Sequence, residues 1–257
     1  MKHLKDKAFT LIETLVALVI GMIAIGAMYF AYQYFNNTYQ SITDRAAMSE
    51  AGRNSLSLIA KDLKNAGYKD INYSRSAWDR KIEVKNNYNS RGADYLSIWF
   101  NSDQNTRIQS EYYIEQTGSQ TNLVKQLIEN PVVDPKKAYC ERYSNQRNCK
   151  PMIIVENVTD FQVVLRDSTG NELTSVGLSS AEAIANQDKV HTAEIYVTVR
   201  SPNELYKTSK ITKILNHNFT LQKNDQYHRE TFYLSVYLRN LIKIWKLEIE
   251  IQKKVLL

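Results

Sequence analysis

A long uncharged segment near the N-terminus constrains the fold of this chain more than any other feature. No charged residue occurs from Thr14 to Thr43, and the most apolar part of the segment is Thr14–Phe35. As an α-helix this part extends about 33 Å at about 1.5 Å per residue, which matches a hydrocarbon core about 30 Å thick. The sequence therefore predicts one membrane-spanning helix.

The charges on either side of this segment predict its orientation. Three lysines lie within the first seven residues, and the first charges after the segment are Asp44 and Arg45. By the positive-inside rule, the lysine-bearing end stays in the cytoplasm and the following chain is exported. Small-residue cleavage signals beyond Phe35 are poor, so we expect the span to remain in the mature protein as a single-pass anchor.

An acidic residue, Glu13, stands at the very start of the apolar segment. A carboxylate in the hydrocarbon costs about 2.5 to 3.5 kcal/mol on insertion scales, and a plain membrane anchor gives no reason for that cost. Such a charge normally has a partner. The alternative is a side chain that snorkels to the interface.

The residues around Glu13 carry a family resemblance. Residues 7–18 read Lys-Ala-Phe-Thr-Leu-Ile-Glu-Thr-Leu-Val-Ala-Leu, which resembles the prepilin cleavage and methylation motif of type IV pilin-like proteins. The resemblance implies cleavage between Ala8 and Phe9, methylation of the Phe9 amine, and pairing of Glu13 with the Phe9 ammonium of a neighbouring subunit. Such pairing offsets the cost of burying either charge alone. The family nearly always has glycine before the scissile bond, where this chain has Ala8.

Beyond the span the hydrophobic pattern becomes amphipathic. Leu56, Ile59, Leu63 and Ala66 recur at helical spacing with charges on the other side, and Gly67 is placed to end the helix. We therefore expect five regions, in chain order: a cleaved leader at 1–8, a transmembrane helix at 9–35, its amphipathic continuation at 36–67, a globular head at 68–240, and an extension of unassigned role at 241–257.

Segments of alternating and β-branched residues dominate the chain after Tyr68 and predict strands. They are Tyr95–Phe100, Glu111–Glu115, Leu123–Ile128, Met152–Val155, Phe161–Arg166, Ala193–Arg200 and Thr231–Leu238. A turn is predicted at Asp167–Gly170, and a short capped helix at Ser179–Ala185. The predicted fold class is α+β, with a long N-terminal helix packed on an antiparallel β-sheet head, as the resemblance to pilins also implies.

The two cysteines, Cys140 and Cys149, lie close together in a polar stretch. No histidine or further cysteine lies nearby to complete a zinc site. In an oxidising compartment we predict a disulfide between them, which would stabilise the fold by about 2 to 3 kcal/mol. Two unpaired thiols in a reducing cytosol are the alternative.

The sequence offers no recognisable set of catalytic or cofactor-binding residues. The four histidines are scattered, and there is no phosphate-binding glycine loop and no Gly-x-Ser-x-Gly elbow. The net charge is +6 without a dense Lys/Arg tract, which does not favour nucleic acid as a partner. We therefore predict a protein that is not an enzyme and that binds neither metal nor cofactor.

Patches of the later sequence resemble PilW-type minor pilins. They are residues 51–68, 154–164, 195–201 and 232–240. The resemblance implies a minor pilin that joins other minor pilins and the major pilin to prime a type IV pilus near its tip, after processing by the prepilin peptidase and methylase. It also implies transfer from the inner membrane, with the head in the periplasm, to the extracellular pilus. A large tip adhesin is a further candidate partner.

Three alternatives remain open at this point. A minor pseudopilin of a type II secretion system shares the leader, helix and head. A pilus subunit that contacts DNA or a surface adhesin would need an exposed binding face. A membrane-anchored enzyme or sensor would carry its leader motif by coincidence and would not need Glu13 for function.

Overall fold

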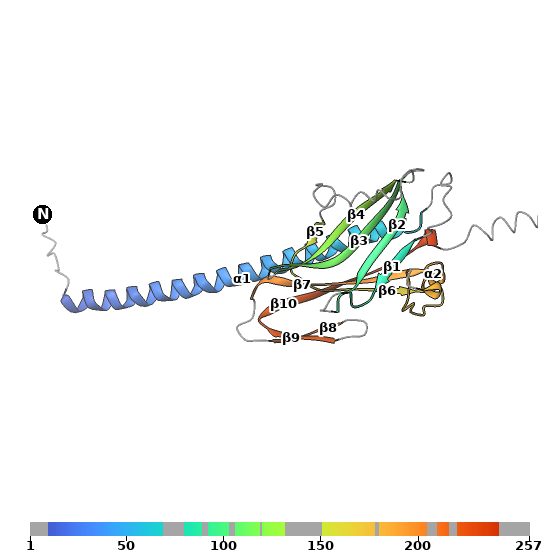
Figure 1. Ribbon diagram of the computed structural model, residues 1–257. Coiled ribbons are helices and arrows are strands. Elements are labelled where there is room, and N and C mark those ends of the chain that lie inside the picture. The colour runs from blue at the N-terminus through green and yellow to red at the C-terminus, as the bar shows by residue number, and fades with distance from the viewer. Residues whose placement is uncertain are drawn as a thin grey trace, which may run out of the picture. The chain divides into compact units, whose positions relative to one another are not determined.

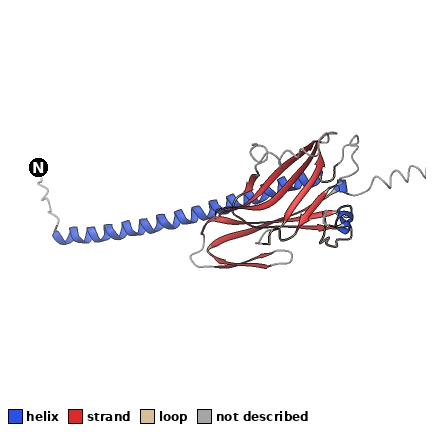
Figure 2. Cartoon of the chain, viewed as in Figure 1, coloured by secondary structure: helices blue, strands red, loops and turns tan. Residues whose placement is uncertain are grey.

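The computed structural model describes residues 10–68, 80–88, 92–102, 106–118, 120–131, 151–177, 180–204, 210–215 and 220–241. The chain divides into two compact units, Met1–Ala46 and Ala47–Leu257. In Figure 2, one long helix and a series of strands account for most of the described residues.

The long helix, α1, runs from Leu11 to Asn65 and contributes to both units. Its sequence contains no proline, so no position interrupts the backbone hydrogen bonds of the helix. Among the described residues, α1 is the one helix that is long and apolar enough to cross a membrane, and its most apolar window contains no buried residue.

Gly67 ends the helix, as predicted. Its φ is 71°, a left-handed conformation that glycine adopts without strain, and its backbone N–H donates to the carbonyl of Trp99 at 2.8 Å. A Cβ at this position would overlap the side chain of Leu241. The side chain of Asn240 donates to the carbonyl of Lys64 at 2.9 Å and satisfies one of the last carbonyl groups of α1.

The first sheet has five antiparallel strands in the order β1-β2-β3-β4-β5, so each strand lies beside the next along the chain. This sheet is labelled in Figure 1. The strands are β1 (Ile82–Lys85), β2 (Tyr95–Asn101), β3 (Thr106–Thr117), β4 (Gln120–Pro131) and β5 (Met152–Val155).

The second sheet has three antiparallel strands in the order β10-β7-β6. They are β6 (Val158–Arg166), β7 (Thr192–Glu204) and β10 (Tyr227–Tyr237). The helix α2 (Ala181–Gln187) lies between β6 and β7 in the chain, and a separate hairpin of β8 (Lys210–Leu215) and β9 (Thr220–Asp225) lies between β7 and β10. A 3-10 turn, η2 (Arg239–Leu241), follows β10.

One hydrophobic core holds the second unit together. The helix contributes a stripe of buried residues that includes Met48, Leu56, Ile59 and Leu63. Both sheets contribute to the same cluster, with side chains such as those of Leu96, Ile98, Tyr112, Leu123, Phe161, Ile195 and Phe232. Gly52 lies directly against the Phe232 ring, where a Cβ would overlap the ring.

The predicted fold class is confirmed: α1 packs on antiparallel sheets through its second half. All seven predicted strands correspond to β2 to β7 and β10, and the last prediction extends one residue beyond the end of β10 at Tyr237. The predicted short helix is α2, which begins after its N-cap Ser180, and the Asp167–Gly170 turn is closed by a backbone hydrogen bond of 3.1 Å. β1 and the β8–β9 hairpin were not predicted from the sequence.

Candidate functional site

Thr10 and Glu13 cap the start of α1. The Glu13 carboxylate atom Oε2 accepts from the backbone N–H of Thr10 at 2.8 Å and from its hydroxyl at 3.0 Å. In return, the Glu13 N–H donates to the Thr10 hydroxyl at 3.3 Å. This reciprocal arrangement is a capping box, which satisfies backbone donors that the first turn of a helix leaves open.

Glu13 also remains accessible. Thr10 and Glu13 are both exposed in the single chain, and both bonds to Thr10 use the same carboxylate oxygen. A cationic group from another subunit could therefore approach the second oxygen without breaking the cap. The capping box gives a local reason for a carboxylate at this position, in addition to the subunit pairing that the family resemblance implies.

The first unit presents a continuous apolar surface. Every large apolar side chain in the span is at least half exposed within the chain, from Leu11 at 79% to Val19 at 50%. The aromatic residues Tyr29, Phe30 and Tyr32 continue this surface toward the end of the apolar segment. An apolar surface of this extent requires lipid or other subunits to cover it.

Four of the predicted site residues lie outside the described part of the structure. They are Ala8 and Phe9 at the predicted cleavage point, and Cys140 and Cys149 of the predicted disulfide. Cleavage, methylation and the disulfide therefore remain predictions.

A buried polar cluster fixes the second half of α1 to the five-stranded sheet. The Asp62 atom Oδ2 accepts from the hydroxyls of Ser110 and Tyr112, each at 2.6 Å. The Lys125 ammonium lies 2.6 Å from the same oxygen. Asp62 and Lys125 are 6% and 8% exposed, so the pair is shielded from water, and its energy depends on complete pairing.

The electrostatics of this cluster keep Tyr112 a hydrogen-bond donor. Burial, and then the nearby charge of Asp62, raise the pKa of the Tyr112 hydroxyl well above its ordinary value. The Lys125 ammonium lies 5.5 Å from the centroid of the Tyr112 ring. The cluster therefore ties α1, β3 and β4 together through one carboxylate.

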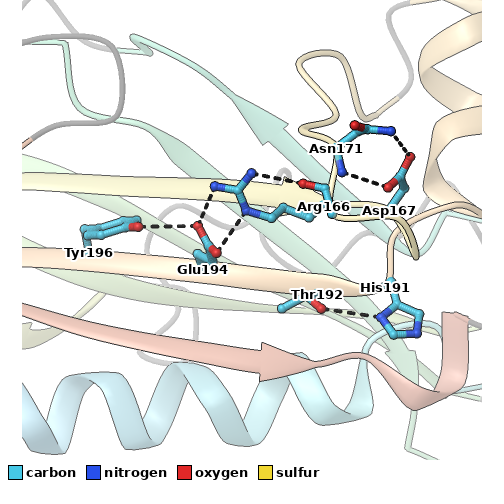
Figure 3. Close-up of polar contacts among 8 residues, drawn as sticks. Arg166, Asp167, Asn171, His191, Thr192, Glu194 and Tyr196 are labelled. Carbon is cyan, nitrogen blue, oxygen red and sulfur yellow. Dashed lines mark hydrogen bonds and ion pairs between the residues drawn. The ribbon is translucent and has the colours of Figure 1, made fainter.

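A second polar group lies on the outer face of the three-stranded sheet (Figure 3). Arg166 of β6 and Glu194 of β7 form a bidentate pair at 2.9 and 3.0 Å, and the Tyr196 hydroxyl donates to Glu194 at 3.3 Å. Hydrogen bonding to Glu194 raises the pKa of Arg166 above its ordinary value. These contacts cross the strands and stabilise the sheet.

The neighbouring turn is closed by its own side chains (Figure 3). One oxygen of Asp167 accepts from the backbone N–H groups of Thr169 and Asn171, both at 2.9 Å, and from the Thr169 hydroxyl at 2.7 Å. These bonds hold the pKa of Asp167 below its ordinary value. Within the described ranges, no group of three or more His, Cys, Asp or Glu side chains is arranged to hold a metal ion.

Comparison with known proteins supports the methylation motif predicted at the N-terminus. Residues 4–29 match the family described as the prokaryotic N-terminal methylation motif. A type IV-like pilin from Thermus thermophilus is similar in structure, with 14% sequence identity and a TM-score of 0.48; the similarity covers 76% of this chain and 96% of that chain. No curated protein sequence matches this chain.

The motif match confirms the predicted resemblance at the N-terminus: residues 4–29 carry a prepilin-type N-methylation motif. Together with the apolar half of α1, the motif indicates that the chain is anchored in a membrane. The PilW-type subtype stays a prediction.

Asp62 was not predicted as a structural residue, because it lies between Lys61 and Lys64 within a charged stretch. Helical spacing could have identified it. Asp62 follows Ile59 by three residues and precedes Ala66 by four, which places it on the buried face of the helix. No sequence pattern predicts that Ser110 and Lys125 lie beside Asp62, because only the β3–β4 register brings them there.

Proposed function

We propose that this protein is a minor pilin of the PilW type, which assembles with other pilins to prime a type IV pilus and takes a place near its tip. The observation that carries the proposal is the methylation motif at residues 4–29, followed directly by the exposed apolar half of α1. A head rich in antiparallel strands on the second half of the helix agrees with this role.

In this proposal the leader of residues 1–8 is removed between Ala8 and Phe9, and the amine of Phe9 is methylated. Thr10 and Glu13 then become the second and fifth residues of the mature chain. Because the capping bonds involve only Thr10 and Glu13, removal of the leader leaves the cap intact. Glu13 arrives at a neighbouring subunit with its side chain already oriented, and there it pairs with the Phe9 ammonium.

The proposed route begins in the inner membrane and ends outside the cell. The head lies in the periplasm before assembly, and the chain enters the pilus with other minor pilins and the major pilin. The Cys140–Cys149 disulfide would form in the periplasm. Thiol labelling of the purified protein tests the disulfide: two cysteines should react only after reduction, and labelling without reductant would contradict it.

Filament assembly by Glu13 variants tests the proposal. In the source cell lacking this protein, we expect the wild-type chain to restore surface pili and Glu13→Ala to fail, although the variant is still inserted in the membrane. Glu50→Ala is the matched control, because Glu50 is an exposed acidic residue on the same helix outside the apolar segment. Normal piliation with Glu13→Ala would contradict the role given to Glu13 and favour a plain anchor.

A pulldown of the full chain from membranes distinguishes the nearest alternative. Minor and major pilins should be recovered with it. Recovery of type II secretion components without pilins would overturn the pilus assignment in favour of a pseudopilin.

A further inference from the structure

The outer edge of β10 has no strand beside it among the described residues. β10 ends its sheet and pairs with β7 alone in that part of the chain. The Leu238 N–H donates to the His191 carbonyl at 2.9 Å, and this bond fixes the alternation of backbone groups along β10. Even-numbered residues therefore bond to β7. The outward N–H groups, called here the outward amides, belong to Thr231, Tyr233, Ser235 and Tyr237.

Two other strand edges of the head are covered by the chain itself. At β6, the Asp94 N–H donates to the Phe161 carbonyl at 2.8 Å. At β1, the Val84 N–H donates to the Val176 carbonyl at 3.1 Å. Each contact occupies a backbone group that would otherwise be open to another strand. The described ranges provide no such contact along the outer edge of β10.

The sequence of β10 also lacks the features that usually protect an edge strand. Residues 231–238 read Thr-Phe-Tyr-Leu-Ser-Val-Tyr-Leu, without charge, proline or glycine. Natural edge strands are commonly short, bulged or marked with lysine or proline. The one register shift in the β10–β7 pairing lies between Tyr227 and Arg229, before this stretch. The edge is therefore suited to backbone pairing with a further strand.

Opposite charges stand at the two ends of the uncharged stretch. Glu230 precedes it and Arg239 follows it, and both residues are exposed. A strand that arrives antiparallel places its last residues near Glu230 and its first residues near Arg239. Charge complementarity therefore favours a strand with an acidic residue at its start and a basic residue at its end.

A second copy of β10 carries these charges, but the direction of β10 argues against it. β10 runs the same way as α1, because Gly52 lies against Phe232 and the later Lys64 carbonyl accepts from Asn240. A twofold axis that pairs two β10 edges antiparallel also sets the two α1 helices antiparallel. Two chains anchored in one membrane, with both heads on the same side, cannot adopt that arrangement.

We propose that the outer edge of β10 binds an extended segment of another protein, which adds to the sheet as an antiparallel strand and has an acidic residue at its start and a basic residue at its end. Backbone hydrogen bonds along the edge supply the affinity. The rings of Tyr233 and Tyr237, 53% and 47% exposed, lie on either side of Ser235 in the sequence and select the side chains of the segment. The inference rests on membrane anchoring and not on the proposed pilus role.

A short synthetic peptide tests this docking, with aspartate first, lysine last, and alternating valine and threonine between them. Amide hydrogen exchange of the full chain in detergent is followed by NMR with and without excess peptide. We expect the peptide to slow exchange of the outward amides by about tenfold. A peptide with the two charged residues exchanged should slow it less. The amides of Phe232, Leu234 and Val236 bond to β7 throughout and provide an internal control for folding.

Three results would overturn the proposal. Unchanged exchange of the outward amides with both peptides would show that the edge does not bind a strand. Slow exchange in the dilute free protein would show that the edge is already occupied. Equal slowing by the two peptides would overturn the charge preference assigned to Glu230 and Arg239.

Variants at the centre of the edge refine the same test. Ser235→Pro removes an outward N–H that makes no bond to β7, and should abolish the slowing while the internal control amides stay protected. Ser235→Thr keeps the donor and is the matched control. Slowing that persists in Ser235→Pro would overturn the proposal, because the peptide would then bind elsewhere. Slowing that depends on protein concentration without peptide would also overturn it, in favour of a second copy.

Discussion

At the scale of single residues, the carboxylate of Asp62 forms a buried polar link between α1 and the five-stranded sheet. Three donors converge on one oxygen, and both charged members of the cluster are buried. Removal of one charge from such a pair leaves the other uncompensated in a medium of low dielectric constant. The cluster therefore stabilises the fold only while all of its charged and hydrogen-bonding partners are present.

Lys125→Met should destabilise the head by about 3 to 5 kcal/mol, because it leaves Asp62 buried and charged with two neutral donors. The measurement is denaturant unfolding of the full chain in detergent, followed by tryptophan fluorescence. Lys61→Met is the matched control, since Lys61 is an exposed neighbour of Asp62 on the same helix, and it should change stability by less than about 0.5 kcal/mol.

A double variant separates charge from packing at the same site. Asp62→Asn combined with Lys125→Met removes both charges, so the loss should be smaller than for Lys125→Met alone. An equal or larger loss in the double variant would mean that the Asp62 carboxylate stabilises the head through Ser110 and Tyr112 even without Lys125.

Two carboxylates of the head, Asp160 and Asp225, should contribute to stability with opposite dependence on pH. Burial raises the pKa of Asp160 above its ordinary 3.8, although the Gln162 amide donates to it at 3.0 Å. Above pH 3.8 the unfolded chain therefore loses this proton before the folded chain does, and Asp160 lowers stability as the pH rises. By contrast, hydrogen bonds from Arg229 at 2.6 Å lower the pKa of Asp225, so Asp225 stabilises at neutral pH and the gain disappears as the pH falls through its lowered pKa.

Thermal unfolding of the asparagine variants at pH 7 and below pH 4 tests these signs. At pH 7, Asp160→Asn should raise the Tm and Asp225→Asn should lower it. Both differences should shrink in acid, where the carboxyl groups of the folded and unfolded chains become protonated. A lower Tm for Asp160→Asn at pH 7 would show that its carboxylate has a favourable partner.

At the scale of elements, the contact between α1 and β10 depends on one glycine. Gly52 brings the helix backbone against the Phe232 ring. In an ordinary helix, Gly→Ala stabilises by about 1 kcal/mol. Here the overlap of the new methyl group with the ring should reverse the sign, and Gly52→Ala should destabilise the head by about 1 to 3 kcal/mol.

The same unfolding measurement tests this prediction, with Gly26→Ala as the control. A Cβ at Gly26 meets no atom within 4 Å, so this variant should leave unfolding of the head unchanged. A more stable Gly52→Ala variant would show that the Phe232 ring can move aside at little cost.

Elements with a strong hydrophobic period could be predicted from the sequence, and those set by long-range contacts could not. The apolar segment, the stripe through Ile59 and Leu63, and the alternating strands β6 and β7 all have a local signal. β1 is four residues long and depends on its pairing with β2, and among the described strands β8 and β9 pair only with each other. The Asp62 cluster joins residues from three elements, so no local pattern contains it.

At the scale of the whole molecule, the two units differ in how their apolar side chains are covered. The second unit has its own core and buried polar cluster. The first unit is an apolar helix whose side chains are exposed in the single chain, and it is complete only in lipid or among other subunits. The methylation motif at the start of that helix agrees with the proposed transfer of the chain from the membrane to the pilus.

The most direct test of the central claim is the intact mass and N-terminal sequence of the membrane-extracted protein, from cells with and without their prepilin peptidase. We predict a mature chain that begins at N-methylated Phe9 when the peptidase is present, and a chain that retains residues 1–8 when it is absent. Residues 1–8 retained in both cells would contradict the account, because the motif would then be unprocessed and the protein a plain membrane anchor.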